Sequence, residues 1–314
     1  MTEVLILEKE AATYRDALAA HFPDLVIHAT TALSDALSCC TSVSAVVGLA
    51  HELPSQLLSV MPKLRWIQAL TTGTDSLTAQ SGLSRQVIIT SGRGIHGPQM
   101  SEMAFLYMIA LLRDFRRMMT NQANAQWERW PQRLLMGKTA VLLGIGAISE
   151  DLARRCQAFG MRVIGISDNR SGADGFDAIY PRAQMTEIAA QTDFFIVLVP
   201  YSPATHHMVD ARLLAALPPR AILINLARGN VIDEQALIAA LKEKRITGAG
   251  LDVFATEPLP ADNPLWQMDN VIITPRVGGM SDIYAQQIMP LLLENMGHFI
   301  AGHTDKLRNI VERT

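Results

Sequence analysis

The sequence predicts an α/β protein of two domains, each built around a mostly parallel sheet. The chain has 314 residues, which is enough for two domains. Short apolar runs alternate with helical patterns over residues 1–100 and again from position 139 to position 275. These runs do not alternate with polar residues, as expected of parallel strands that are buried on both faces. The repetition in both halves of the chain therefore indicates two sheets covered by helices.

The composition narrows the class of protein. Hydrophobic residues make up 49% of the chain and charged residues 18%, which is typical of a globular protein. The net charge is −3 and no long cluster of Lys or Arg occurs, so we expect no nucleic-acid partner. The first residues lack the basic start and the apolar core of a signal peptide, and no apolar run reaches the ~18 residues of a membrane span. Three cysteines without metal-ligand spacing indicate free thiols, no metal site and a cytoplasmic location.

Five short apolar runs form the strands of the first expected domain, and helical patterns such as Ala11–His21 separate them. The expected strands are Val4–Leu7, Leu25–His28, Ala45–Leu49, Leu64–Ala69 and Val87–Thr90. Ligands bind beyond the carboxyl ends of parallel strands, which draws attention to two loops. One loop contains Thr72, Gly73 and Thr74, and the other contains His96. Their glycine turns could present backbone amides to an anion, or they could be ordinary tight turns.

A long apolar helix pattern runs from Pro98 to Met119. Its hydrophobicity predicts burial at a domain or subunit boundary, with five methionines as core filler: Met100, Met103, Met108, Met118 and Met119. A polar stretch, Thr120–Arg133, carries Trp127 and Trp130 and leads into the second domain. The final apolar helix, Ser281–Gly302, returns the chain to the first domain. The expected domains are residues 1–100 with 281–314, and residues 101–280.

A glycine turn opens the second domain. The order is strand, turn, helix and strand: Thr139–Leu143, Gly144–Ser149, Glu150–Phe159 and Arg162–Ile166. Gly144 allows a tight turn, and Gly146 lets the backbone approach a pyrophosphate that would bind at the helix N-terminus. Ser149 occupies the third motif position and is small enough for close helix–strand packing. A turn that binds nothing is the alternative, but the βαβ context favours dinucleotide binding.

Charged residues follow the later strands of this domain. The remaining strands and helices are expected at Phe194–Val199, Ala211–Leu217, Ala221–Asn225, Glu234–Lys244, Gly248–Leu251 and Val271–Thr274. Arg228 stands just past a strand end, where an arginine can hold a carboxylate through two parallel hydrogen bonds or can simply cap a loop. Asp252 and Glu257 follow the next strand, and Arg276 follows the last. We expect Arg276 to face a ligand cleft beside Glu257.

The run of motifs from Ala221 to Gly279 resembles the D-isomer-specific 2-hydroxyacid dehydrogenase family, and in particular its glyoxylate and hydroxypyruvate reductases. The motifs are Ile224–Gly229, Val231–Glu234, Gly248–Phe254, Glu257–Pro260, Pro264–Trp266, Asn270–Val271 and Thr274–Pro275. Two further stretches, Val199–Thr205 and Trp66–Asp75, match the family's proline motif and substrate-domain loop. The resemblance covers nearly the whole chain.

The resemblance implies a Rossmann NAD(P)-binding domain inserted into a flavodoxin-like substrate domain. It implies an oxidoreductase that transfers a hydride between a nicotinamide cofactor and a small 2-keto or 2-hydroxy acid, commonly as a homodimer through the cofactor domain. By the same resemblance, Arg228 grips the substrate, Glu257 orients the acid/base residue, and amides near Thr72, Gly73 and Thr74 bind the substrate carboxylate. Asp252 anchors the nicotinamide carboxamide. The full set of expected cofactor-binding residues is Gly144, Gly146, Ala147, Ile148, Ser167, Asp168, Arg170, Val199, Pro200, Thr205, Leu226, Ala227, Asp252 and Gly278.

The chain departs from the family at position 276, where Arg276 replaces the acid/base histidine. Arginine is effectively always protonated and is a poor proton shuttle. Arg276 could stabilise a developing alkoxide by its charge, or it could pair with Glu257. Three alternatives follow: reduction with another proton source, for which His96 is the best candidate; a different reaction, such as formate oxidation; or a dinucleotide-binding regulatory protein. The first is favoured because Arg228, Asp252 and Glu257 are all present.

The residues after the second strand of the βαβ unit do not decide whether the cofactor is NAD or NADP. An acidic residue there would favour NAD, but Ser167 occupies the usual position and Asp168 comes one place later. Ser167, Asn169 and Arg170 could receive a 2′-phosphate, although the charge of Asp168 opposes this. NADP is slightly favoured because the serine–arginine pair resembles the NADP-using reductases.

Overall fold

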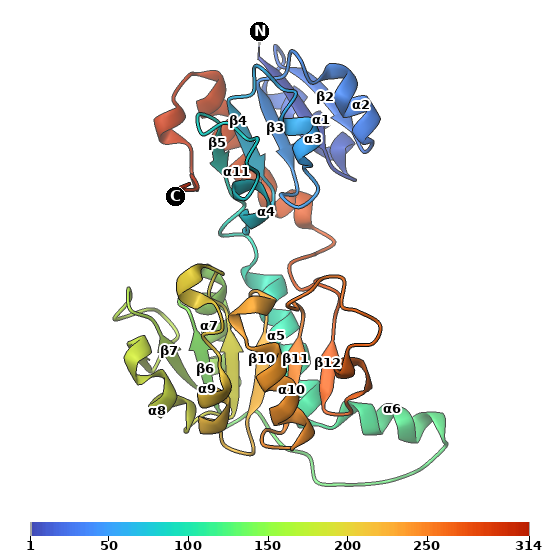
Figure 1. Cartoon of the computed structure of the whole chain (residues 1–314), viewed down its shortest axis with the longest axis vertical. Helices are drawn as coiled ribbons and strands as arrows, with labels where there is room; N and C mark the ends of the chain where they lie inside the picture. The colour runs from blue at the N-terminus through green and yellow to red at the C-terminus, as the bar shows by residue number, and fades with distance from the viewer. Residues whose placement is uncertain (1, 314) are drawn as a thin grey trace. The chain divides into compact units, whose positions relative to one another are not determined.

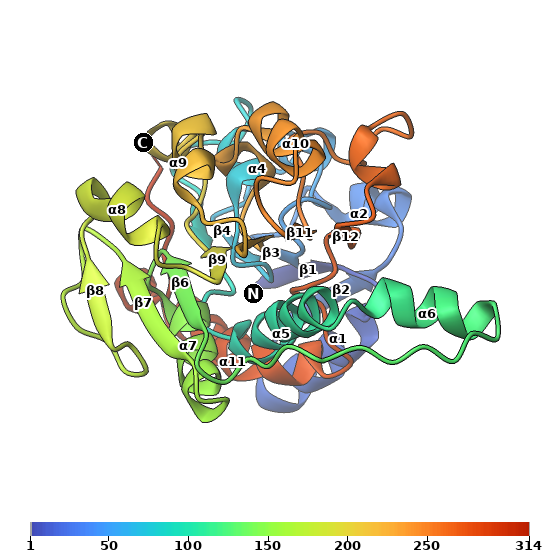
Figure 2. The same cartoon turned by 90° about the horizontal axis from the view of Figure 1, so that it is seen from below.

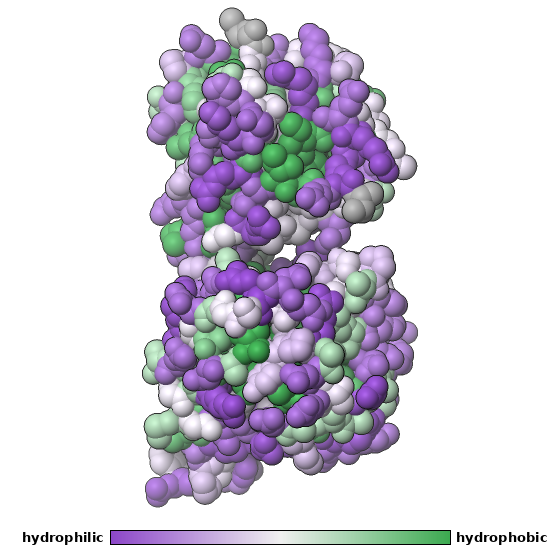
Figure 3. All heavy atoms as spheres, turned by 90° about the vertical axis from the view of Figure 1, so that its left-hand side faces the viewer, coloured by the Kyte–Doolittle hydropathy of each residue, from purple (hydrophilic) through white to green (hydrophobic). Residues whose placement is uncertain are grey.

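The computed structural model describes residues 2–313, which fold into two compact units (Figure 1). Unit 1 contains the described residues up to Ile95 together with those from Ser281 onward, and unit 2 contains His96–Met280. The first crossing between the units therefore lies a few residues before the position expected from the sequence. Each unit holds one parallel sheet, which confirms the predicted α/β class. Hydrophilic side chains cover much of one face of both units, with apolar patches among them (Figure 3).

Unit 1 is built on a five-stranded parallel sheet of order β2-β1-β3-β4-β5. Its strands are β1 (Glu3–Leu7), β2 (Val26–Thr30), β3 (Ala45–Gly48), β4 (Trp66–Ala69) and β5 (Ile88–Thr90). Its helices are α1 (Ala11–His21), α2 (Leu33–Cys39), α3 (Ser55–Leu58), α4 (Asp75–Thr78) and α11 (Tyr284–Ile300). Val4 and Ile6 join a core cluster with α1 and α11, whereas Leu5 and Leu7 join a second cluster with α2 and α3. Because alternate side chains enter opposite cores, β1 is apolar at every position from Val4 to Leu7.

Unit 2 is built on a seven-stranded parallel sheet of order β12-β11-β10-β9-β6-β7-β8. Its strands are β6 (Thr139–Leu143), β7 (Arg162–Ile166), β8 (Ala178–Tyr180), β9 (Phe194–Val197), β10 (Ile222–Asn225), β11 (Gly248–Leu251) and β12 (Val271–Ile273). Its helices are α5 (Gly97–Leu112), α6 (Phe115–Ala123), α7 (Ala147–Ala158), α8 (Met185–Ala189), α9 (Ala211–Ala216) and α10 (Glu234–Lys242). Figure 2 shows α5 and α7 on one side of the sheet and α8, α9 and α10 on the other. The strand order reverses between β6 and β9, which makes the carboxyl ends of these strands the expected ligand position.

The prediction of one long apolar helix from Pro98 to Met119 is wrong, because the chain forms two helices there. Helix α5 ends at Leu112, and α6 begins at Phe115 after Asp114, whose φ of 55° is left-handed. A right-handed helix cannot continue through a left-handed residue. Met100 and Met108 are buried as expected, but Met119 is 48% exposed and therefore does not fill the core. In the part of the chain that the structure describes, no helix combines the length and the apolarity required to cross a membrane.

Candidate active site

The turn after β6 requires glycine at position 144 for two reasons. Gly144 has a φ of +97°, in the left-handed region that other residues rarely adopt. A Cβ atom at this position would also lie only 2.7 Å from Cγ1 of Val199, in the segment that follows β9. The hydroxyl of Ser149 donates a hydrogen bond of 2.6 Å to the Gly144 carbonyl. The serine at the third motif position therefore ties the start of α7 to the turn.

Gly146 differs, because a Cβ atom there would meet no atom of the chain within 4 Å. Packing within the protein therefore does not explain this glycine. The open space lies at the N-cap of α7, a helix of 12 residues. The first backbone N–H groups of such a helix lack partners within it, and its dipole favours an anion. The turn therefore fits the pyrophosphate of a dinucleotide.

The segment that follows β7 is a network of charged side chains. Asp168 accepts a hydrogen bond of 2.8 Å from the backbone N–H of Arg182 and forms an ion pair of 3.1 Å with the Arg182 side chain. Arg170 forms an ion pair of 2.6 Å with Glu150 of α7. The Ser167 hydroxyl accepts a hydrogen bond of 3.2 Å from the backbone N–H of Asn169. The charge of Asp168 is thus offset by Arg182, a residue 14 positions later that no motif of the sequence indicates.

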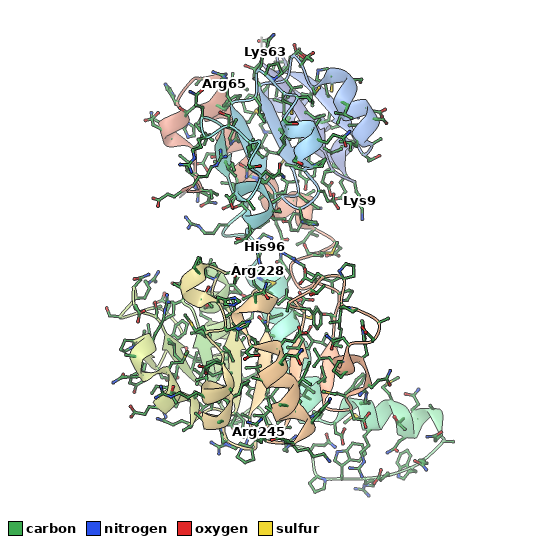
Figure 4. The ribbon with its side chains drawn as sticks, in the orientation of Figure 1. Lys9, Lys63, Arg65, His96, Arg228 and Arg245 are labelled. Carbon is green, nitrogen blue, oxygen red and sulfur yellow. The ribbon has the colours of Figure 1, made fainter. Side chains whose placement is uncertain are left out.

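The loop after β10 places Arg228 at the carboxyl edge of the sheet in unit 2, as Figure 4 shows. The Asn225 side chain holds this loop: its amide donates to the Arg228 carbonyl at 3.0 Å, and its oxygen accepts from the Ala227 N–H at 3.1 Å. A Cβ atom at Gly229 would lie 1.9 Å from the Phe254 carbonyl carbon. Only glycine therefore lets the Arg228 loop pack against the backbone that follows β11.

Asp252, which follows β11, holds the loop that carries Arg276. Its carboxylate accepts hydrogen bonds from the Val277 N–H (2.9 Å), the Gly278 N–H (3.0 Å) and the Thr274 hydroxyl. The Thr274 hydroxyl also forms a hydrogen bond with the buried Tyr107 hydroxyl on α5. Asp252 is only 3% exposed, and this burial raises its pKa, whereas the three hydrogen bonds act in the opposite direction.

Arg276 forms an ion pair with Glu257, which is one of the two arrangements expected from the sequence. The other oxygen of Glu257 accepts a hydrogen bond of 3.1 Å from the Phe254 N–H. Arg276 has a φ of 57°, an unusual conformation for an arginine, and its side chain is 48% exposed. Beside this glutamate the chain therefore has a cation held in an ion pair, where the sequence resemblance led us to expect a histidine.

The remaining predicted residues divide between the two units. Thr72, Gly73 and Thr74 belong to unit 1, where the Thr71 hydroxyl donates a hydrogen bond of 2.7 Å to the Gly73 carbonyl. His96 belongs to unit 2: it is buried, it precedes α5, and a Cβ atom at Gly279 would lie 3.5 Å from its ring. Figure 4 shows His96 at the same edge of unit 2 as Arg228.

Other predicted cofactor residues follow three strands of unit 2, namely β6, β9 and β10. Ala147 and Ile148 begin α7, whereas Leu226 and Ala227 belong to the Arg228 loop. Pro200 follows β9, and its carbonyl accepts a hydrogen bond of 2.8 Å from the Thr205 hydroxyl. Within residues 2–313, no three His, Cys, Asp or Glu side chains are grouped so that they could hold a metal ion.

The fold and these loops define the class of protein: an α/β protein with a dinucleotide-binding turn at the point where its strand order reverses. Residues 105–278 match the family model described as D-isomer specific 2-hydroxyacid dehydrogenase, NAD binding domain. The chain therefore belongs to the D-isomer specific 2-hydroxyacid dehydrogenase family. This membership confirms the predicted oxidoreductase class, the hydride transfer involving a 2-keto or 2-hydroxy acid, and the NAD(P) cofactor.

Relatives and solved structures agree with this membership. The chain is 32% identical over 247 residues to (S)-sulfolactate dehydrogenase of Chromohalobacter salexigens, covering 77% of this chain and 79% of the relative. It is 30% identical over 270 residues to glyoxylate reductase of Thermococcus litoralis, covering 83% and 81%. A family protein from Aeromonas salmonicida is similar in structure, with a TM-score of 0.93, 33% identity, and coverage of 100% and 99%. The NADPH-dependent glyoxylate/hydroxypyruvate reductase of Sinorhizobium meliloti, in complex with NADP and sulfate, has a TM-score of 0.86, 25% identity, and coverage of 100% and 99%.

Proposed function

We propose that the protein is a reductase of small 2-keto acids of the glyoxylate and hydroxypyruvate type, with a preference for NADPH. The observation that carries this proposal is the placement of Arg228, Asp252 and Glu257 after neighbouring strands of the sheet that also carries the glycine turn. Relatives named glyoxylate reductase support the choice of substrate. In this proposal unit 2 binds the cofactor, and unit 1 contributes the substrate loop with Thr72, Gly73 and Thr74.

The proposed roles follow from the chemistry of each side chain. When bound, a nicotinamide dinucleotide supplies the hydride. The Arg228 guanidinium binds the substrate carboxylate by parallel hydrogen bonds and polarises the keto oxygen. Arg276 stabilises the negative charge that develops on that oxygen. Because Arg276 retains its proton, His96 or water supplies the proton that completes the alcohol.

The preference for NADPH rests on the segment after β7. The ion pair with Arg182 offsets the negative charge of Asp168, which would otherwise repel a 2′-phosphate. Ser167 then offers a hydroxyl donor to that phosphate, and Arg170 offers a guanidinium that it shares with Glu150. We expect Ser167→Asp to shift the preference toward NADH, because a carboxylate there accepts bonds from a ribose 2′-hydroxyl. The ratio of kcat/KM with the two cofactors measures this, and an unchanged ratio would contradict the assignment of this segment.

The direct test of the function is an assay with purified protein. NADPH and, separately, NADH are mixed with glyoxylate, hydroxypyruvate, pyruvate and phenylpyruvate in turn, and oxidation of the cofactor is followed by absorbance. We expect turnover of the smaller keto acids with NADPH. We expect Arg228→Gln to lower kcat/KM by about 100-fold or more, because the positive charge and the pair of parallel hydrogen bonds to the carboxylate are lost. Tight dinucleotide binding without turnover of any keto acid would overturn the reductase proposal.

We also propose that the protein is a homodimer that associates through unit 2. Large apolar side chains are exposed on α5, on α6 and on the segment that follows α6: Leu106, Ile109, Phe115, Met119, Trp127, Leu134 and Met136. Trp127 is 95% exposed, which is unfavourable for an aromatic side chain of a monomer. A groove of about 490 Å³ lies between α6 and residues 125–130. A second copy of the same surface would cover these side chains.

The free cysteines Cys39, Cys40 and Cys156 support the further proposal of a reducing, cytoplasmic location.

A further inference from the structure

The C-terminal segment, residues 307–313, extends the sheet of unit 1 beyond β5. Ile310 forms an antiparallel bridge with Thr90, and the Val311 N–H donates to the Ile89 carbonyl at 2.8 Å. Figure 1 shows this segment beside β5. At its start, the buried Asn295 side chain of α11 binds both the N–H and the carbonyl of Arg308, at 2.7 and 3.2 Å. At its end, the Arg313 guanidinium donates to three carbonyls before β5: Leu83, Ser84 and Val87.

Between these two attachments, Asn309 binds the loop that follows β5. Its side-chain amide donates to the Ser91 carbonyl at 3.2 Å and to the Arg93 carbonyl at 2.7 Å. Its backbone carbonyl accepts from the Ser91 N–H at 3.0 Å. Asn309 has a φ of 59°, a left-handed conformation that asparagine tolerates better than most residues. Three hydrogen bonds from one residue therefore hold residues 91–93 in one position.

That loop packs directly on the proposed substrate loop, which begins at Leu70. The Gly92 N–H donates to the Thr71 carbonyl at 2.8 Å. A Cβ atom at Gly92 would lie 2.2 Å from the Leu70 carbonyl oxygen, so only glycine permits this approach. The Tyr284 hydroxyl, on α11, donates to the same Leu70 carbonyl at 2.7 Å. The position of residues 70–73 thus depends on residues 91–93, and these in turn depend on Asn309.

We propose that Asn309 is a positioning residue for substrate binding: it acts through Ser91 and Gly92 to hold the amides near Thr72, Gly73 and Thr74 in the geometry that receives the substrate carboxylate. The inference rests on the proposed function, since that function assigns these amides to the substrate. A carboxylate held by fixed backbone N–H groups is bound without the entropic cost of ordering the loop. Loosening the loop therefore raises the KM for the keto acid and leaves cofactor binding unchanged.

The test compares Asn309→Asp with a neighbouring control, Arg308→Ala. Aspartate has nearly the same shape and also tolerates a left-handed φ, but its carboxylate would face the Ser91 and Arg93 carbonyls without a donor. The Arg308 side chain is exposed and forms an ion pair with Glu294, away from the loop. Asn309→Gly is a second variant that keeps the backbone conformation and removes the side chain. Circular dichroism and thermal unfolding check that all three variants are folded.

Two readouts keep this inference distinct from the proposed function. First, hydrogen–deuterium exchange of peptides covering residues 70–75 and 89–93 needs no turnover; we expect protection to fall about tenfold in both Asn309 variants and to remain in Arg308→Ala. Second, the KM for glyoxylate should rise about tenfold in the Asn309 variants with unchanged NADPH affinity. Unchanged exchange in residues 70–75 would overturn the coupling. Increased exchange with an unchanged KM would overturn the substrate role. Absence of turnover in the unmodified protein would contradict the proposed function, and exchange would still decide the coupling.

Discussion

At the scale of single residues, the site is defined by side chains whose charges are satisfied by their own loops. Glu257 accepts from the Phe254 N–H and pairs with Arg276, and Asp252 accepts from three donors of the loop that carries Arg276. Arg276 itself has a left-handed backbone, which costs roughly 1–3 kcal/mol for a residue other than glycine. Such a cost is maintained only where the surrounding contacts determine the conformation, and the hydrogen bonds of Asp252 provide these contacts.

Replacing Arg276 with histidine tests the missing acid. Histidine tolerates a left-handed φ, so Arg276→His should fold. A histidine beside Glu257 donates a proton only in its protonated form. Activity that depends on it is therefore present at low pH and is lost as the pH rises through the histidine pKa. The reduction rate of each protein is measured between about pH 6 and pH 8. We expect the fall in rate across this range to be about tenfold larger in the variant than in the unmodified protein. Parallel pH profiles of the two proteins would show that position 276 takes no part in proton transfer.

Thr274→Val tests the hydrogen bond that stabilises the ionised form of buried Asp252. The bond from Thr274 lowers the Asp252 pKa, so its contribution to stability is present when Asp252 is ionised and is lost as the pH falls and the carboxyl protonates. The variant should lose about 1.5–3 kcal/mol in the free energy of unfolding at pH 7, and less in the acid range. Urea unfolding at pH 7 and pH 5 measures the difference. Tyr107→Phe is the control, since it keeps Thr274 and the ring that packs on Gly250. A loss that is equal at both pH values would exclude this explanation.

At the scale of elements, the two glycines of the turn before α7 have different roles: Gly144 is required for the stability of the turn, and Gly146 leaves space for a ligand. Gly144→Ala introduces a Cβ atom 2.7 Å from Val199 at a left-handed φ, and should lower the free energy of unfolding by about 1–3 kcal/mol. Gly146→Ala introduces a Cβ atom into open space, so its stability should be unchanged. Its dissociation constant for NADPH should rise about tenfold or more, because the methyl group occupies the space for the phosphates. Denaturant unfolding and fluorescence titration of both variants distinguish these effects. Equal NADPH affinity in Gly146→Ala would place the pyrophosphate elsewhere.

The elements that could be predicted from the sequence are those with a strong apolar run. Arg162–Ile166 is a strand with the predicted bounds, and its apolar residues Val163, Ile164 and Ile166 are buried. By contrast, β8 was not predicted, because it is an apolar run of only three residues, all of them half-buried. The break between α5 and α6 was also missed, because its left-handed residue is Asp114 rather than the glycine that usually marks such a position.

The site was partly predictable for a related reason. Arg228, Asp252 and Glu257 follow strands of one parallel sheet, so their shared edge follows from strand positions. The ion pair between Arg276 and Glu257 was one of the expected arrangements, but two other partners could not be predicted: Arg182 lies 14 residues from Asp168, and Asn309 lies 218 residues from Ser91. Such pairs depend on how loops fold back onto the sheets. No local pattern in the sequence predicts how these loops fold back.

At the scale of the whole molecule, the exposed aromatic residues of unit 2 predict its association. The segment after α6 is held by an ion pair between Arg117 and Glu128 and by the Arg117 guanidinium, which lies 4.3 Å from the Trp130 ring centroid. Trp127→Ser combined with Leu106→Asp should convert a dimer into a monomer, because a charge buried without a partner costs several kcal/mol. Sedimentation velocity measures the mass of both proteins. Lys9→Gln, at an exposed position in unit 1, is the control, because it changes the net charge by the same −1. A monomeric unmodified protein would contradict the proposed interface.

The order of the two units along the chain also has a consequence for synthesis on the ribosome. Unit 2 is one continuous stretch, whereas unit 1 is made from the first 95 residues and from those after position 280. Domains generally fold as units while the chain emerges. Unit 2 is therefore complete before α11 and the last edge of the first sheet have been translated. The unit that is begun first is completed only after the residues that follow position 280 have been added, and its β5 edge stays uncovered until then.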